Sequence, residues 1–480
     1  MSDNNNMLSD MSNHKIESVL DRLTACQASL QAALQNPACT AGTLETTLET
    51  TGRDLLRGLL EPALQALADT VEPHCPGCHQ ALRIEARAKP RTITTVFGPI
   101  RFLRDYGWCR HCRQWFYPAD QRLGLAPNAP ASPRVQEIAA LLTLKMPPAQ
   151  AEAVMERVAG LPLSRSTLDR ETYRQGLRAQ AVRDSQAALT QTPGGVAALA
   201  AKAQAGLPQE PFTLVIELDA FNIRERDHWG QTQSRLDQGL EISRWHWVYT
   251  GTCFRLDQRG VTAGGRPLIT QRGYVATRLG LEEFDRQLYA EALQRGLLQA
   301  QKVLVIADGA VWIWNWAQDR FQYATHRLDL WHLKEHLWTV ANEIHGAGTP
   351  EAAAWIKSLF QPLENRTDGA ARTLSRLEQL KITMNQLTQN QQSMLEREIQ
   401  YFKTNQNRMD YAAGKKAGEP LGSGAIESTC RQYQCRFKRS GQFWSLEGDE
   451  ALIALETLYR NDRWHLLFPH IESPTPMNNN

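Results

Sequence analysis

The sequence lacks a long apolar run and a strong excess of charge of either sign. No stretch is long enough for a transmembrane helix, and the polar segment 1–14 contains no apolar signal-peptide core. Its 53 basic and 51 acidic residues give a net charge of only +2, so overall charge identifies no partner. We therefore expect a soluble cytoplasmic protein with no membrane partner, in which any nucleic-acid contact is made by local patches.

Cysteine is also scarce, with nine residues in 480. Four of them form two Cys-x-x-Cys pairs: Cys75, Cys78, Cys109 and Cys112. In a reducing compartment such pairs favour metal binding over a disulfide. Two such knuckles can supply four thiolates to one structural Zn²⁺, and four free cysteines in a core are the alternative.

The residues between the two pairs predict a β-hairpin. Residues 92–97 alternate as a strand does, residues 100–106 read as the returning strand, and Gly98-Pro99 is the expected turn. Knuckles joined by a hairpin predict a zinc ribbon. Its basic residues face either a phosphate backbone or solvent: Arg83, Arg87, Lys89, Arg91, Arg101 and Arg104.

Changes in composition divide the chain. The predicted segments are an N-terminal tail with helices at 1–70, the zinc ribbon at 71–126, a helical region at 134–190, the first part of an α/β core at 211–349, a helical insertion at 350–412, the last part of the core at 413–468 and a tail at 469–480. Residues 191–211, rich in Gly, Ala and Pro, are expected to be a linker.

Residues 149–178 predict two helices with a break at Gly160-Leu161-Pro162. Ser164 or Ser166 is a suitable N-cap for the second helix. This pattern is typical of a helix-turn-helix that turns Arg165 and Arg170 toward DNA. An ordinary helical hairpin is the alternative.

The core segment predicts a mixed α/β sheet. A strand at 212–219 ends on Asp219, and two further β segments follow at 245–254 and 274–278. After a helix at 281–298 comes a continuous apolar strand, 303–307, which ends on Asp308. A short strand and a helix beginning near Asp329 follow.

Three carboxylates in this pattern are candidate metal ligands. Asp219 and Asp308 end strands, and Glu427 begins a helix behind the turn Gly422-Ser423-Gly424. Mg²⁺ prefers such hard oxygen ligands and supports phosphodiester chemistry. Glu217 is an alternative first acid, and Asp308 could instead cap the next helix. The basic run after Glu427 is expected to follow a nucleic-acid backbone: Arg431, Arg436, Lys438 and Arg439.

The order of these parts resembles bacterial insertion-sequence transposases of the DDE type. GSGAIES followed by RFKRSGQFW is similar to the C-terminal signature of the ISKra-type group, and VIADGAVWIW resembles the segment with the second acid. LDLWH, with Asp329 and His332, resembles an Asp-x-x-His element that follows that acid. The likeness spans roughly residues 70 to 465.

The resemblance implies an α/β fold with an RNase H-like mixed sheet and a helical insertion, preceded by the zinc ribbon and the helix-turn-helix-like region. It implies Asp219, Asp308 and Glu427 as the catalytic triad on Mg²⁺ or Mn²⁺, with Asp329 and His332 in support. The expected partners are double-stranded DNA, both element ends and target, and further copies of the chain, at least a dimer on DNA. The implied location is the bacterial cytoplasm, at the nucleoid when bound to DNA.

One residue departs from the family pattern, because Ala220 follows Asp219 where Gly is expected. Two other functions stay open. A domesticated transposase would bind DNA without catalysis, and an RNase H-like nuclease would cut without joining.

Overall fold

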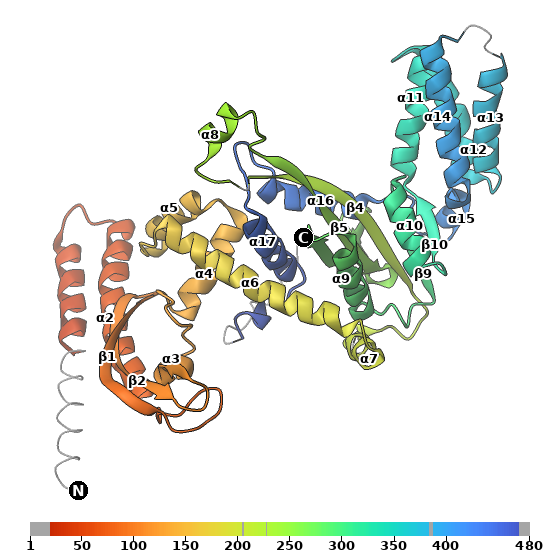
Figure 1. Ribbon diagram of the computed structural model, residues 1–480. Coiled ribbons are helices and arrows are strands. Elements are labelled where there is room, and N and C mark those ends of the chain that lie inside the picture. Colours follow the sequence, from red (N-terminus) through yellow and green to blue (C-terminus); the bar gives the residue numbers. More distant parts are fainter. Residues whose placement is uncertain (1–19, 204–205, 227, 384–386, 470–480) are drawn as a thin grey trace, which may run out of the picture. The chain divides into compact units, whose positions relative to one another are not determined.

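The computed structural model describes residues 20–203, 206–226, 228–383 and 387–469 (Figure 1). The chain forms two compact units, Met1–Thr172 and Tyr173–Asn480, and their boundary falls within helix α6 (Arg165–Leu189). Among the described residues, no helix has both the length and the apolar character needed to cross a membrane. The expected tail at 1–14 and residues 470–480 of the tail expected at 469–480 lie outside the described residues.

The N-terminal unit combines helices with one small sheet. After a helix that ends at residue 35, its elements are α2 (Ala41–Asp69), β1 (Arg83–Thr95), β2 (Gly98–Cys109), β3 (Gln114–Phe116), α3 (Pro118–Arg122), α4 (Pro133–Lys145), α5 (Pro148–Ala159) and the start of α6. Leu60 and Leu64 of α2 pack with Ile93 and Phe102 of the hairpin. The predicted hairpin is therefore confirmed and lies against a long helix.

The hairpin turn differs from the prediction. Thr95 pairs with Gly98, so the turn is Val96-Phe97, and Pro99 lies inside β2 opposite Thr94. Pro99 is tolerated because the Thr94 N–H points away from it and donates to the Pro130 carbonyl (2.8 Å). The sequence pattern missed this because proline is usually a turn residue.

The C-terminal unit is built on a five-stranded mixed sheet. Its elements up to the sheet's last strand are α7 (Pro193–Ala201), β4 (Thr213–Glu225), α8 (Thr232–Asp237), β5 (Arg244–Arg255), β6 (Arg259–Val261), β7 (Pro267–Ile269), β8 (Gly273–Thr277), α9 (Leu281–Gln294), β9 (Lys302–Ala307), α10 (Val311–Arg320) and β10 (Thr325–Leu328). The remaining elements are α11 (Leu330–His345), α12 (Pro350–Asn365), α13 (Gly369–Thr383), α14 (Gln389–Asn405), α15 (Tyr411–Lys416), α16 (Gly424–Phe437) and α17 (Leu446–Arg460).

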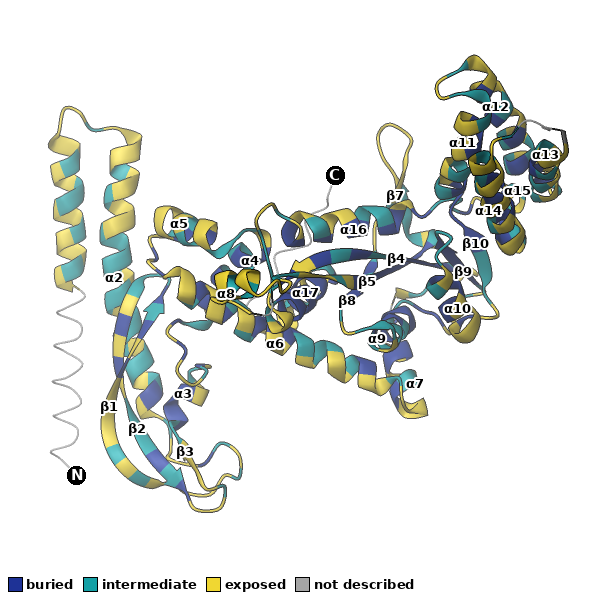
Figure 2. Ribbon diagram, turned by 45° about the horizontal axis from the view of Figure 1, so that its top comes forward, coloured by how far each residue is buried: buried dark blue, intermediate teal, exposed yellow. Residues whose placement is uncertain are grey.

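Strand β4 is the centre of this sheet, whose order is β10-β9-β4-β5-β8. β5 and β8 continue from it antiparallel, and β9 and β10 lie parallel on its other side. Both faces are covered, because Leu214, Ile216 and Leu218 pack in the core with α9 and α10, while Val215 contacts Ala425 of α16. Figure 2 shows the resulting buried strands between helices. The predicted mixed α/β sheet is confirmed.

The segment expected to be a linker is partly structured. Residues 193–201 form α7, which Thr192 caps through the Gly195 N–H (3.1 Å). Leu199 is fully buried in the core of the C-terminal unit. The prediction of a plain linker was wrong for these residues, because alanine and leucine offer an apolar face that a neighbouring helix can cover.

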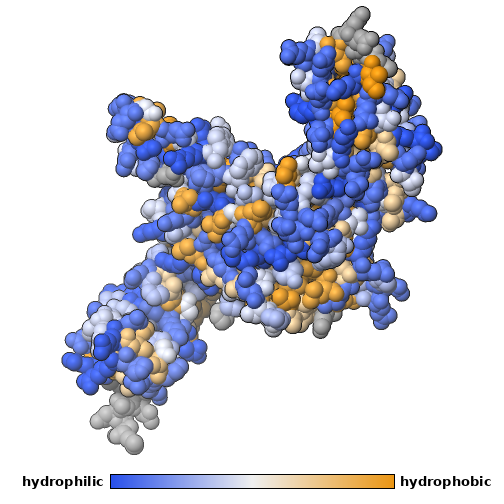
Figure 3. All heavy atoms as spheres, turned by 45° about the vertical axis from the view of Figure 1, so that its right-hand side comes forward, coloured by the Kyte–Doolittle hydropathy of each residue, from blue (hydrophilic) through white to orange (hydrophobic). Residues whose placement is uncertain are grey.

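The segment expected to be a helical insertion is helical. α12, α13 and α14 follow α11, and their buried leucines continue the core of the sheet region. Figure 3 shows hydrophobic residues also reaching the surface of this region. Ile382 is 74% exposed and Trp338 is 37% exposed.

Arg327 of β10 ties the insertion to the sheet. Its fully buried guanidinium donates to Asp410 (2.9 and 3.1 Å), Glu419 (2.9 Å) and the Pro420 carbonyl (3.0 Å). Its guanidinium also packs so closely on Gly414 that no side chain fits there. A single buried cation thus joins β10 to both ends of α15.

We predict that Arg327→Ala lowers the free energy of unfolding by about 3–5 kcal/mol, because it leaves buried carboxylates without their cation. Urea unfolding of the full chain measures this. Arg376→Ala on the exposed surface of α13 is the control and should change stability by less than about 0.5 kcal/mol. Equal effects of the two substitutions would contradict the prediction.

Candidate functional site

Four thiols meet in the N-terminal unit as predicted. The ligand atoms of Cys75, Cys78, Cys109 and Cys112 all lie within 4.8 Å of one another. The Sγ atoms of Cys75 and Cys112 are 3.7 Å apart, and those of Cys78 and Cys109 are 3.5 Å apart. Tetrahedral thiolate zinc, with Zn–S near 2.3 Å, places sulphurs about 3.8 Å apart. The residues therefore fit a metal such as zinc.

Two of the ribbon's arginines do not face solvent. Arg91 and Arg104 both pair with the buried Asp120, and the distance between Arg91 Nη1 and Asp120 Oδ2 is 2.6 Å. Burial lowers the pKa of Arg104 to about 10. These two residues hold α3 on the hairpin, so neither the phosphate-facing nor the solvent-facing alternative describes them.

We predict that the purified chain contains about one Zn²⁺ and that Cys109→Ser loses it, because three thiolates hold the ion less well than four. Elemental analysis after dialysis measures the content. Cys435→Ser, at an exposed cysteine of α16, is the matched control and should keep the metal. Full zinc content in Cys109→Ser would rule out this ligand set.

In the C-terminal unit, the sheet brings Asp219 and Asp308 to adjacent positions. Leu218 of β4 pairs with Ala307 of β9, so the two acids are the next residues on neighbouring parallel strands, which lie about 4.8 Å apart. The Asp308 carboxylate accepts the Ala310 N–H (2.9 Å), and Ala310, not Asp308, is the N-cap of α10. The alternative prediction, that Asp308 caps the next helix, was therefore wrong.

Helix α16 carries the third acid, Glu427, in its first turn. The helix is fixed on β4 because buried Glu217 accepts the Ile426 N–H (2.8 Å), and the Cys430 thiol lies 3.6 Å from Asp219 Oδ2. Glu217 is only 1% exposed. Asp219 is thus the more accessible of the two candidate first acids.

Negative charge is concentrated among these acids. Burial, together with Asp308 and Glu427, raises the pKa of Asp219 to about 6. Burial raises the pKa of Glu217 to about 8. A cation between the three acids would relieve their repulsion, and carboxylate oxygens are the ligands that Mg²⁺ prefers. Among the described residues, however, only the four cysteines bring three or more ligand atoms within 4.8 Å.

Asp329 and His332 lie beside the acids. Asp329 caps α11 by accepting the His332 N–H (2.8 Å), and it also accepts the Ser423 hydroxyl (2.7 Å) just before α16. The His332 ring is 3.2 Å from Asp329 Oδ1 through Nδ1 and 3.7 Å from Glu427 Oε1 through Nε2. This pair therefore connects the start of α11 to the start of α16.

The Asp329 carboxylate raises the pKa of His332 to about 9. Burial opposes ionisation of Asp329, but hydrogen bonds from His332 and Ser423 lower its pKa to about 2. His332 is therefore an imidazolium at neutral pH. It is the one positive group that these contacts place against Glu427.

We predict that His332 titrates near pH 9 in an NMR pH titration and that Asp329→Asn moves this pKa toward 6.5. Because the pKa of His332 is raised in the folded state, protonated His332 stabilises the fold. This contribution is fully present below about pH 6.5 and is lost as pH rises through 9. Asp319→Asn, at an exposed acid of α10, should leave the titration unchanged. An unshifted His332 pKa in Asp329→Asn would contradict the assigned pairing.

Tyr401 is a neighbour that the sequence pattern did not indicate. It comes from α14 of the helical insertion and packs so closely on Gly309 that a side chain there would clash with its ring. Among the described residues its buried hydroxyl has no hydrogen-bond partner. Burial and then Asp308 raise the pKa of this phenol above its usual value. Sequence periodicity could not reveal this contact, because Gly309 and Tyr401 are 92 positions apart in the chain.

The predicted DNA-binding residues differ in exposure. Arg165 and Arg170 are exposed on the first turns of α6, while Leu168 of the same turns is buried. Arg431 and Lys438 are exposed on and after α16, and Arg439 is half-buried. Arg436 is only 6% exposed and stacks over Trp444, 5.0 Å from the ring centroid. Its proposed DNA contact is not supported, because burial keeps its charge off the surface.

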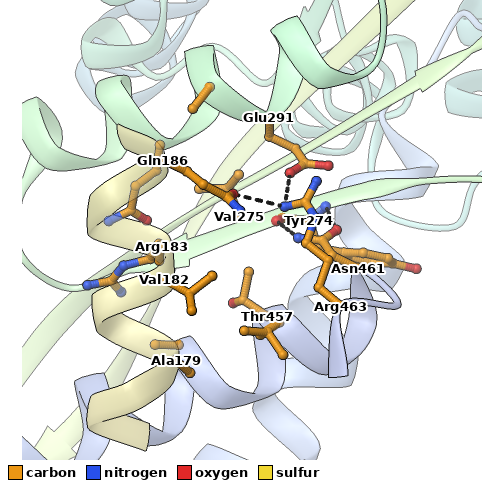
Figure 4. A pocket seen from close by; sticks show the side chains of 14 residues that line it. Ala179, Val182, Arg183, Gln186, Tyr274, Val275, Glu291, Thr457, Asn461 and Arg463 are labelled. Atoms are coloured by element: carbon orange, nitrogen blue, oxygen red, sulfur yellow. Dashed lines mark hydrogen bonds and ion pairs between the residues drawn. The ribbon is translucent and has the colours of Figure 1, made fainter. Parts of the chain in front are cut away.

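A cavity of the C-terminal unit lies elsewhere, between α6, β8, α9 and α17 (Figure 4). Several of its polar side chains bond to one another or to the backbone. Arg463 pairs with Glu291 (2.7 Å). The Asn461 side chain accepts a hydrogen bond from the Tyr274 N–H and donates one to the Tyr274 carbonyl (2.8 Å each). None of the candidate acids lines it, so this cavity is separate from the three carboxylates.

Comparison with known proteins adds no assignment. No protein-family model matches the chain, and no curated protein is significantly similar to it.

Proposed function

We propose that the chain is a DDE-type transposase, which binds the ends of an insertion sequence and catalyses metal-dependent DNA cleavage and strand transfer. One observation carries the proposal. Asp219 and Asp308 end neighbouring parallel strands, and Glu427 lies on a helix that packs on the same strand β4. Three carboxylates that are distant in sequence come near one another at one end of the sheet, and Asp308 and Glu427 both act on the charge of Asp219. Carboxylates are the ligands that two-metal phosphodiester chemistry uses.

The sheet topology supports an RNase H-like core. Strands β4, β5, β8, β9 and β10 can be numbered 1 to 5 in chain order, and they then lie side by side in the order 3-2-1-4-5. Neighbouring strands among 1, 2 and 3 are antiparallel, whereas strands 4 and 5 run parallel to strand 1. The helical segment of α12 to α15 precedes the helix that bears Glu427. This is the position that the resemblance assigns to an insertion domain.

In this proposal Asp219, Asp308 and Glu427 are the carboxylates that hold Mg²⁺ or Mn²⁺. When bound, the ions activate the attacking oxygen and stabilise the leaving oxygen. Imidazolium His332, held by Asp329, positions the Glu427 side chain. Exposed Arg165 and Arg170 contact element-end DNA, and a structural zinc orders the ribbon. A dimer or larger assembly on DNA is part of the proposal.

A non-catalytic DNA-binding protein is the second candidate, and it would tolerate loss of any of the three acids. An RNase H-like nuclease is the third, and it would cut without forming joined products. Inverted repeats and a short target duplication around the gene would favour an active transposase over either one.

We predict that Asp308→Asn reduces strand transfer by about a thousandfold or more, because a lost metal ligand removes several kcal/mol of transition-state stabilisation. The assay uses Mg²⁺ and DNA that carries the terminal repeats flanking the gene. Asp319→Asn, which preserves all three acids, should retain activity. Unchanged transfer by Asp308→Asn would refute the catalytic assignment, and cleavage without joining in the unsubstituted chain would favour a nuclease.

A further inference from the structure

Strands β4 and β5 extend beyond the rest of their sheet. β9 pairs with β4 only as far as Leu218, and β8 pairs with β5 only from Tyr249 onward. Residues 219–225 and 244–248 therefore form a two-stranded ribbon that runs from the acids toward α8, as Figure 1 shows.

One face of this ribbon carries exposed aromatic side chains. Trp245 is 58% exposed and Trp247 is 57% exposed. They pair across the ribbon with Arg224 and Asn222, and directly opposed residues share a face of a sheet. Trp229, which is 54% exposed, and half-buried Phe443 lie close to the same arginine-bearing end of the ribbon.

Cations lie among these rings. The Arg224 guanidinium is 5.7 Å from the Trp245 ring centroid and 5.0 Å from that of Phe443. The Arg226 guanidinium is 3.9 Å from the Phe443 centroid, and the Lys438 ammonium is 5.9 Å from that of Trp245. We call Trp229, Trp245, Trp247, Phe443, Arg224, Arg226 and Lys438 the aromatic–arginine patch.

The opposite face of the ribbon is firmly anchored. Glu225 is buried and pairs with His246 and with Arg278, each at 3.2 Å. Arg278 also pairs with Asp449 of α17 (2.8 Å). The tryptophans are thus exposed on an ordered ribbon rather than at a frayed strand end. Indole rings held in water on an ordered surface mark an interaction site.

We propose that the aromatic–arginine patch binds an unpaired DNA strand, whose bases stack on Trp245 and Trp247 and whose phosphates contact Arg224, Arg226 and Lys438. Charge complementarity indicates a nucleic acid, and open ring faces require bases that are not already stacked in a duplex. Arg224 lies five positions after Asp219 on β4, or about 17 Å at 3.3 Å per residue. A strand end held at the acids can therefore reach the patch. This last step rests on the proposed function, but the binding itself does not.

The test measures fluorescence anisotropy of labelled single strands of about ten nucleotides with the full chain and no divalent metal. One probe is oligothymidylate, and the other is an abasic strand of equal length and charge. We expect Trp245→Ala with Trp247→Ala to weaken oligothymidylate binding by about 10–100-fold, as loss of base stacking does, and to leave abasic binding unchanged. Trp338→Ala, at an exposed tryptophan of α11, should change neither.

A second variant separates charge from stacking. Arg224→Ala should weaken both probes and reduce the salt dependence of binding, because it removes a phosphate contact. Circular dichroism and thermal unfolding confirm that each variant is folded. Asp319→Asn should bind oligothymidylate as the unsubstituted chain does.

Two outcomes would overturn the proposal: unchanged oligothymidylate binding in the double variant, or an equal loss for both probes. The second would point to plain charge attraction. Absence of strand transfer with tryptophan-dependent binding intact would refute the proposed function alone.

Discussion

The C-terminal unit depends on the need to neutralise acids that the central strand buries. Glu217, Asp219 and Glu225 all face the side of β4 that α16 and α17 cover. A buried carboxylate costs several kcal/mol unless it is paired or protonated. The Ile426 N–H and the Cys430 thiol of α16 contact Glu217 and Asp219, while His246 of β5 and Arg278, which follows β8, pair with Glu225. Helix α16 thus returns to the first strand after the whole helical insertion, and that return places Glu427 near Asp219.

Much of this architecture could be predicted from the sequence. The apolar run 303–307 has no alternation because both faces of β9 are buried, and this marks a central parallel strand. A helix was expected to begin near Asp329, and Asp329 caps α11. The four cysteines meet because two-residue spacers and a hairpin leave them few other arrangements. These features are local, so local patterns reveal them.

Apart from the hairpin turn, the features that sequence reasoning missed are set by packing against other elements. Arg436 looks like its basic neighbours along the chain, yet Trp444 covers it and removes its charge from the surface. Trp245 and Trp247 look like core residues, yet β8 and β9 end before they reach them. The 193–201 segment looks like a linker until α9 supplies an apolar partner. In each case the deciding neighbour lies on another element, where composition and periodicity give no information.

The contact between Gly309 and Tyr401 couples the insertion to the second acid. Since glycine leaves no side chain between them, the tyrosine ring rests directly on the backbone that follows Asp308. Tyr401 lies near the C-terminal end of α14 (Gln389–Asn405), so the helical segment touches the backbone next to the second acid directly and not only through the sheet.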